Sequence, residues 1–162
     1  MGAAHDVAPN FIMEMNIEEE IKQSKFRSEQ QKASINLLFT TNWLSNKHKD
    51  FFKQYDLTPQ QFNVLRILRG QHPKSISTSD IKERMLDKNS DTSRIVDRLT
   101  IKKLVSKNEC PSDRRLVDVI ITKEGLKVLE NMDDAINKLD ESIRLNPEEA
   151  KTLNDLLDKL RG

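Results

Sequence analysis

Most of the chain carries apolar residues at helical spacing, with one central stretch that alternates instead. A short amphipathic helix is expected over residues 17–26, and residues 29–55 predict a longer helix with no Gly or Pro inside. Residues 58–61, Thr-Pro-Gln-Gln, mark the start of a third helix, because the threonine can cap, the proline suits the first helical position and the second glutamine can close a capping box. Gly70 is expected to end this helix.

Two further short helices and a hairpin are predicted in the centre of the chain. Ser-Thr-Ser-Asp at residues 77–80 repeats the capping pattern, and a second helix is expected from about residue 89 to 102. Residues 104–109 and 116–121 change to the period of a two-faced strand, with turn-forming residues between them. Three short helices followed by such a hairpin predict a winged helix-turn-helix.

Two helices close the chain: Thr122 is expected to cap a long one that extends to Ile143, and Asn146 to cap the last one. The apolar stripes of the N- and C-terminal helices exceed what one small lobe can cover, so we expect them to pair with a second copy. The predicted segments are a leader that is disordered or left by an expression vector (1–15), N-terminal dimerisation helices (16–56), a winged helix-turn-helix lobe (57–122) and C-terminal dimerisation helices (123–162). The predicted fold class is mainly α with a small β-hairpin, a winged helix-turn-helix within a helical dimerisation frame.

Composition narrows the class of protein. A chain of 162 residues, 36% of them apolar and 33% charged, fits one ordinary domain. A single Cys cannot form an intramolecular disulfide, which favours a reducing compartment. No apolar run approaches the roughly 18 residues of a membrane helix, and no signal peptide with a basic start and an apolar core is visible. We therefore expect a cytoplasmic protein that has no membrane partner.

The net charge of +1 hides an uneven distribution. Residues 57–123 carry 14 basic and 8 acidic side chains, whereas residues 1–56 have a net charge of −1 and residues 124–162 a net charge of −4. A basic centre between such ends is typical of a protein whose middle contacts a polyanion. The alternative, on charge alone, is a chance excess of basic residues on a solvated face.

The predicted winged helix supplies both elements that such proteins place on double-stranded DNA, a helix for the major groove and a hairpin for the minor groove. Small polar and basic side chains near the start of the 89–102 helix can reach base edges and phosphates, and the hairpin tip carries two arginines. The candidate DNA-binding residues are Ser77, Thr78, Asn89, Ser90, Ser93, Arg94, Arg98, Arg114 and Arg115.

The same region carries a family resemblance. Residues 92–99, Thr-Ser-Arg-Ile-Val-Asp-Arg-Leu, followed by Leu-Val at 104–105, Asp-Arg-Arg at 113–115 and Ile-Thr-Lys-Glu-Gly at 121–125, resemble the MarR family of bacterial transcription regulators. The wing motif of that family is Asp-x-Arg, several residues, an aliphatic residue followed by Thr, two residues and Gly. The positions that match its spacing are Asp113, Arg115, Ile121, Thr122 and Gly125. The likeness covers about residues 29–160.

The resemblance implies a homodimer that binds a specific DNA sequence, commonly a repressor released by a small-molecule effector, here of unidentified chemistry. It also implies that Arg115 enters the minor groove at the wing tip while Asp113 orients its guanidinium group. A two-fold dimer with one reading helix per subunit predicts an inverted-repeat operator. Lys103 stands where the family usually has Gly, so either Lys103 adopts a left-handed conformation or the turn differs.

Several candidates have a structural alternative. Arg94 and Arg98 can form surface pairs with Ser90 or Asp91 and with Asp97; the winged-helix pattern favours a DNA contact for Arg94 and leaves both interpretations of Arg98 open. Aromatic residues either line an effector pocket or, more commonly at helical spacing, form plain core; these are Phe39, Trp43, Phe51, Phe52, Tyr55 and Phe62. Cys110 does not lie near the N-terminal helices, where redox-sensing members of the family carry their cysteine, so no redox role is assigned to it.

The sequence does not favour an enzyme. It contains no Gly-rich phosphate loop and no nucleophile elbow, and His5, His48 and His72 lie far apart in the chain. We therefore predict no catalytic activity, no cofactor and no metal. The competing interpretation is a winged helix that serves only as a protein-interaction or dimer scaffold module without specific DNA binding. Loss of the basic residues from the helix and the wing would favour that interpretation, and here they are retained.

Overall fold

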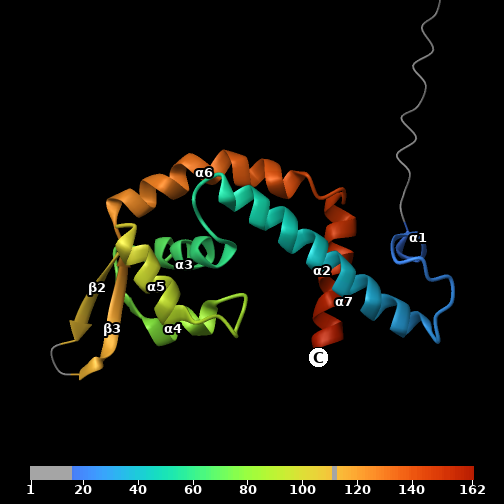
Figure 1. Cartoon of the computed structure of the whole chain (residues 1–162), viewed down its shortest axis with the longest axis horizontal. Helices are drawn as coiled ribbons and strands as arrows, with labels where there is room; N and C mark the ends of the chain where they lie inside the picture. Colours follow the sequence, from blue (N-terminus) through green and yellow to red (C-terminus); the bar gives the residue numbers. More distant parts are fainter. Residues whose placement is uncertain (1–15, 111–112) are drawn as a thin grey trace, which may run out of the picture. The chain divides into compact units, whose positions relative to one another are not determined.

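The computed structural model describes residues 16–110 and 113–162, so the predicted leader at 1–15 lies outside the described residues. The chain divides into two compact units, the first ending at Phe51 and the second running from Phe52 to Gly162. In chain order the elements are α1 (Ile17–Glu20), α2 (Glu29–Lys53), α3 (Pro59–Arg69), β1 (Ile76–Ser77), α4 (Thr78–Arg84), α5 (Thr92–Ile101), β2 (Val105–Cys110), β3 (Asp113–Ile121), α6 (Lys123–Glu141) and α7 (Pro147–Arg161) (Figure 1). None of the described helices is long and apolar enough to cross a membrane.

The first unit consists of α1 and most of α2. Asn16 caps α1 by accepting the Glu19 backbone N–H at 3.0 Å, and Ile17 is buried. Lys32 of α2 forms an ion pair with Glu18. The hydrogen bond between these two side chains is the main reason why the pKa of Glu18 is lowered and the pKa of Lys32 is raised. Together these contacts fasten α1 to α2.

α1 is much shorter than the helix predicted over residues 17–26. The chain leaves the helix at Lys22, whose φ of 53° is left-handed. The backbone N–H groups of Lys22 and Gln23 donate to the carbonyls of Glu19 and Glu18, which satisfies the end of the helix. Because this position holds a lysine and not the usual glycine, nothing in the sequence indicates that the helix ends here.

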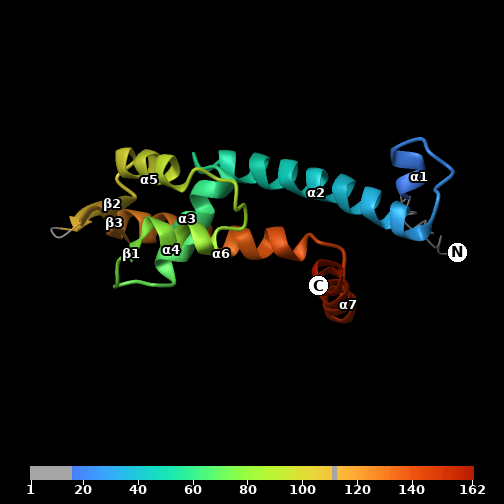
Figure 2. The same ribbon diagram turned by 90° about the horizontal axis from the view of Figure 1, so that it is seen from below.

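The second unit is built around one apolar core to which α3, α4, α5, β3 and α6 all contribute. The largest fully buried side chains are Val64, Leu65, Leu68, Ile81, Met85, Val96, Leu99, Val119, Leu129 and Met132. Arg69 of α3 donates to both carboxylate oxygens of Asp133 in α6, at 2.8 and 3.0 Å. The core therefore places α5 and the sheet on a rigid support. α7 lies at the end of α6 remote from the sheet (Figure 1, Figure 2).

The helix starts predicted at Thr58, Ser77, Thr122 and Asn146 are confirmed. Thr58, Ser77 and Asn146 each form a capping box with the residue three positions later. Thr122 caps α6 by accepting the backbone N–H of Gly125 at 3.1 Å. These starts could be predicted because every partner lies within one turn of the chain.

The wing is a three-stranded antiparallel sheet in the order β1-β3-β2. The predicted hairpin is confirmed, with Val105 opposite Ile121 and Lys107 opposite Val119. The additional strand β1 was not predicted; in it Ile76 pairs with Val119. Two residues are too few to show an alternating pattern, and the pairing is made with a segment far along the chain.

The end of α5 has the left-handed form of the two alternatives considered for Lys103, whose φ is 60°. The Lys103 N–H donates to the Thr100 carbonyl at 2.9 Å, and the Leu104 N–H donates to the Leu99 carbonyl at 3.0 Å. This pair of hydrogen bonds is a Schellman motif, which a glycine usually forms. The non-glycine residue is accepted here because the bonds on either side hold the turn.

The start of α6 is locked to that turn. The Thr122 hydroxyl donates to the Lys103 carbonyl at 2.8 Å, and the Thr122 N–H donates to the Leu104 carbonyl at 3.1 Å. A Cβ on Gly125 would lie 2.3 Å from the Leu104 carbonyl oxygen, so only glycine leaves room for this approach. The Thr-x-x-Gly part of the motif therefore has an architectural role, joining the wing, α5 and α6.

Candidate nucleic-acid interface

Helix α5 buries one face and presents the other to solvent. Asp91 caps it by accepting the Arg94 backbone N–H at 3.0 Å. Thr92, Val96 and Leu99 are buried, as predicted. The exposed face carries Ser93, Arg94, Asp97 and Arg98. The buried face fixes the helix on the core, so the exposed side chains are carried on a rigid element.

Asn89 and Ser90 lie in the turn before α5, not in the helix as predicted. Asp87 organises this turn: one carboxylate oxygen accepts the Asn89 N–H at 3.0 Å, and the other accepts the Ser90 hydroxyl at 2.9 Å. Because the Asp91 carboxylate supplies the cap, the helix starts only at Thr92. Asn89 remains exposed and Ser90 is half-buried, so both lie immediately ahead of the exposed face of α5.

Asp97, the acidic residue on the exposed face of α5, is neutralised by a lysine of the wing. Lys107 of β2 forms an ion pair with Asp97. Neither Arg94 nor Arg98 forms an ion pair with any residue that the structure describes. Within the described residues, then, neither surface pair considered for these arginines is formed. Two guanidinium groups on α5 are left available for an anionic partner.

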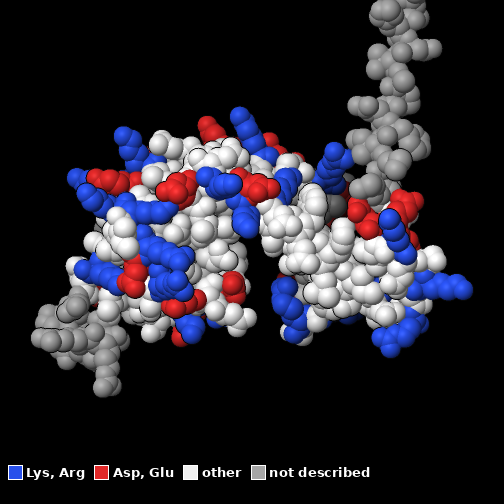
Figure 3. All heavy atoms as spheres, in the orientation of Figure 1, with Lys and Arg blue, Asp and Glu red and all other residues white. Residues whose placement is uncertain are grey.

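The charge distribution on the surface agrees with this arrangement. Lys and Arg side chains gather over the place where Figure 1 draws α5, with acidic groups interspersed among them (Figure 3). Arg94 and Arg98 of the basic segment 57–123 therefore belong to a face on which Lys and Arg side chains are frequent. A concentrated positive face is what attraction to a phosphate backbone requires.

Ser77 and Thr78 lie at the junction of β1 and α4 and are half-buried. The Ser77 hydroxyl accepts the Asp80 backbone N–H at 3.1 Å and donates to the Asp80 carboxylate at 2.8 Å. Ser77 therefore has a structural role as the cap of α4. A DNA contact by Ser77 or Thr78 stays a prediction.

The wing residues are placed by their backbone alone. Asp113, Arg114 and Arg115 begin β3, and Asp113 pairs across the hairpin with Cys110. The side chains of these four residues lie outside what the structure describes. Their predicted roles, a minor-groove contact for the arginines and an orienting role for Asp113, stay predictions.

Two residues that position the interface were not predicted. Lys107 pairs with Asp97 only because the sheet brings β2 beside α5. Asn63 of α3 is 5% exposed, and its side-chain oxygen accepts the Leu86 N–H in the α4–α5 turn at 3.0 Å. The one sequence feature that could have predicted this contact is the position of Asn63 next to the apolar pair Val64-Leu65. A polar side chain buried there needs a hydrogen-bond partner.

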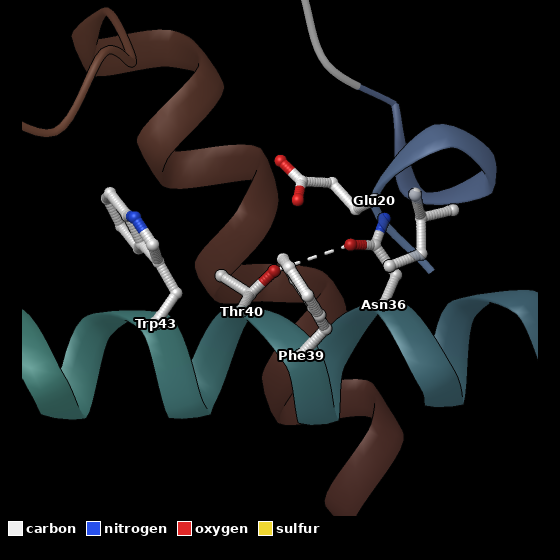
Figure 4. Close-up of a pocket in the computed structure, with 6 residues that line it drawn as sticks. Glu20, Asn36, Phe39, Thr40 and Trp43 are labelled. Atoms are coloured by element: carbon white, nitrogen blue, oxygen red, sulfur yellow. Dashed lines mark hydrogen bonds between the residues drawn. The ribbon is translucent and has the colours of Figure 1, made fainter. Parts of the chain in front are cut away.

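The six aromatic residues considered for a pocket divide into two groups. Phe52 and Phe62 stack in the second unit, with ring centroids 4.5 Å apart, and Phe51 and Tyr55 are half-buried. Phe39 and Trp43 line a hollow that belongs entirely to the first unit (Figure 4).

Across residues 16–110 and 113–162, no three His, Cys, Asp or Glu side chains are grouped closely enough to hold a metal ion.

The chain is similar to known transcription regulators. The model of the MarR family matches residues 55–116. The HTH-type transcriptional regulator MgrA of Staphylococcus aureus is 27% identical over 145 residues, which cover 90% of each chain. The solved structure of a MarR transcription factor from Planctomyces limnophilus is 31% identical, covers 85% of this chain and 98% of its own, and superposes with a TM-score of 0.66. BpsR of Bordetella bronchiseptica, described for the regulation of its DNA binding by 6-hydroxynicotinic acid, is 27% identical, with coverages of 78% and 99% and a TM-score of 0.66.

Proposed function

Since the chain belongs to the MarR family of DNA-binding transcription regulators, we propose that it acts as a homodimeric repressor of an inverted-repeat operator. The observation that carries this proposal is the exposed face of α5, where Arg94 and Arg98 have no ion pair among the described residues and Asp97 is neutralised by Lys107. The family is one of regulators, so no catalytic activity is expected. Because the proposed function is exercised on DNA, we expect the protein in the cytoplasm.

Each element has a distinct role on DNA in this proposal. α5 enters the major groove, where Ser93, Arg94 and Arg98 meet base edges and phosphates. The residues before α5 and at the start of α4, which are Asn89, Ser90, Ser77 and Thr78, contact the phosphate backbone. The wing reaches the adjacent minor groove with Arg114 and Arg115, and Asp113 orients the second of these arginines.

A second copy is needed to cover the apolar side of α7. No residue of α7 is buried, although Leu153, Leu156 and Leu160 repeat along one side of the helix and are 44%, 58% and 68% exposed. Such a stripe is unfavourable in water and typical of an interface between subunits. We therefore assign α7 to the dimer, which sets two copies of α5 against one operator.

Selection of bound sequences from a random DNA library tests the proposal. The expected result is an inverted repeat of about 16–20 bp, with half-sites about 10 bp apart on one face of the duplex. A single unrepeated half-site as the best sequence would contradict the dimer. No enrichment, together with passage through heparin at low salt, would favour the interaction module instead.

Relief by a small molecule completes the proposed function. BpsR, the relative whose DNA binding is regulated by 6-hydroxynicotinic acid, supports the idea that a ligand controls DNA binding here too. At 27% identity that likeness does not carry over the chemistry of the ligand. The ligand class has to come from this chain's own residues.

Arg94→Ala is expected to weaken binding to the selected operator by about fivefold to 150-fold, or ~1–3 kcal/mol, and to relax the preference at one base pair per half-site. The reason is the loss of a guanidinium group that can bond two acceptors of guanine. Fluorescence anisotropy across single-base operator variants measures both effects. Arg66→Ala, which removes an exposed arginine from α3, is the matched control. A uniform loss on every sequence would instead place Arg94 on a phosphate.

Lys107→Ala is expected to weaken DNA binding by about fivefold, or ~1 kcal/mol, on specific and random DNA alike. The substitution removes the ion-pair partner of the Asp97 carboxylate, whose negative charge then repels the DNA phosphates. Adding Asp97→Asn should recover most of the loss, whereas Lys127→Ala, which removes one charge from α6, should have little effect. If Asp97→Asn recovered nothing, Lys107 would act on DNA directly and not through Asp97.

Arg115→Ala is expected to weaken binding across sequences and to lower the slope of log affinity against log salt by about one per subunit. Asp113→Ala should reproduce part of the loss, because it frees the guanidinium group that Asp113 is proposed to orient. Titrations at several salt concentrations measure the slope. Tighter binding by Asp113→Ala would mean that removing a negative charge outweighs orientation of the arginine.

A further inference from the structure

A hollow of about 260 Å³ between α1 and α2 is not used by the DNA-binding surface. Its lining residues are Ile17 and Glu20 of α1 and Asn36, Phe39, Thr40 and Trp43 of α2 (Figure 4). The four residues of α2 follow a helical repeat of three and four, so one face of one helix forms a whole wall. The volume lies just below the range of drug-sized sites, roughly 300–1,000 Å³, so it suits only a small ligand.

The opposite wall is held in place. Ile17 is 5% exposed, Asn16 caps the short helix α1, and Glu18 is paired with Lys32 of α2. These contacts hold α1 beside α2, and Glu20 extends from α1 as one of the lining residues of the hollow (Figure 4). The hollow is therefore bounded by two elements that are bonded to each other.

The chemistry of the lining favours a cation. Glu20 is the only charged residue that lines the hollow, and it forms no ion pair with any residue that the structure describes. Phe39 and Trp43 add aromatic rings, which attract positive charge to their faces. The Trp43 ring already does so in this structure, because the Lys47 Nζ lies 5.2 Å from its centroid. Lys47 itself does not line the hollow.

The remaining polar groups can orient a ligand. The Thr40 hydroxyl donates to the Asn36 side-chain oxygen at 3.3 Å, as the dashed line in Figure 4 marks. This bond directs the Asn36 oxygen toward Thr40 and leaves the Asn36 amide N–H groups as donors. A ligand with a polar substituent beside its ring would find a partner there.

We propose that this hollow binds a small organic cation, an ammonium group attached to a flat apolar ring, with the ammonium group against Glu20 and the ring against Phe39 and Trp43. Such a cation is the effector of the regulator, a step that rests on the proposed function. The binding site itself does not depend on that step, so the two are tested by separate measurements.

Trp43 is the only tryptophan of the chain, so the intrinsic fluorescence of the full-length protein reports directly on the hollow. Benzyltrimethylammonium is the probe, and benzyl alcohol and benzoate are its neutral and anionic counterparts. The expected result is a saturable change in emission with the cation and at least about tenfold weaker binding of the other two compounds. Equal affinity for the three compounds would overturn the proposal.

Glu20→Gln keeps the size of the side chain and removes its charge. It is expected to weaken binding of the cation by at least about tenfold. Glu19→Gln, a neighbouring exposed glutamate that does not line the hollow, should leave binding unchanged. Unchanged binding by Glu20→Gln would overturn the proposal. So would a change in Trp43 emission that follows protein concentration and not the probe, because a second copy would then cover the hollow.

Operator binding at a saturating concentration of the cation tests the effector step. We expect at least about a fivefold change in operator affinity, absent in Glu20→Gln. Selective binding of the cation with unchanged operator affinity would overturn the effector step and retain the site. Failure to select any operator would overturn the proposed function, while the fluorescence titration would still decide whether the site exists.

Discussion

Gly125→Ala is expected to lower the free energy of unfolding by about 3 kcal/mol, because a new methyl group has no space. The added Cβ would lie 2.3 Å from the Leu104 carbonyl oxygen and 2.7 Å from the Ile121 Cγ1. Backbone must move to accept it, which strains the hydrogen bond from the Thr122 N–H to the same carbonyl. Urea denaturation followed by circular dichroism measures the loss.

Gly70→Ala is the matched control. Its Cβ would have no neighbour closer than 3.5 Å, and Gly70 has an ordinary helical φ of −66°. The substitution is expected to be neutral or stabilising by up to about 1 kcal/mol, because alanine restricts the unfolded chain. Equal destabilisation by the two substitutions would mean that the close approach at Gly125 is not what requires glycine.

Replacing Leu156 and Leu160 of α7 together by Glu is expected to give a folded monomer whose operator affinity falls by about a hundredfold or more. Both leucines are exposed in the single chain, at 58% and 68%, so their loss does not disturb its core. The dimer is lost because two charges enter its apolar contact. Operator affinity then falls because each half-site is bound without its linked partner. Analytical ultracentrifugation and DNA titration measure the two effects.

The control places the same change in charge on the polar side of α7, by Lys151→Gln with Asn154→Glu. Both residues are exposed, and the ion pair lost between Lys151 and Asp155 is a surface pair of small energetic value. This variant should remain dimeric and bind its operator normally. A dimer that persists with both leucines replaced would remove α7 from the interface.

The parts of the fold that could be predicted are those with short-range causes. The capping boxes at Thr58, Ser77 and Asn146 join residues three apart, and the buried face of α5 follows from a helical repeat. The start of α5 was placed too early because Asn89 and Ser90 bond to Asp87 in a turn, and the Asp91 carboxylate then caps the helix. The end of α1 was placed too late because a lysine, Lys22, and not a glycine, adopts the left-handed conformation there.

By itself, the sequence determined the order of helices and hairpin, the helix that presents Arg94 and Arg98, and the resemblance to a family of regulators. Periodicity, caps and motif spacing depend on residues that lie within a few helical turns of one another in the sequence. They can therefore be recognised without the folded structure. Only the tertiary structure decided that Lys107 neutralises Asp97, that Asn63 holds the α4–α5 turn and that Gly125 admits the Leu104 carbonyl. Each of these contacts joins residues of different helices, strands or turns, and their meeting depends on how those elements pack in the fold.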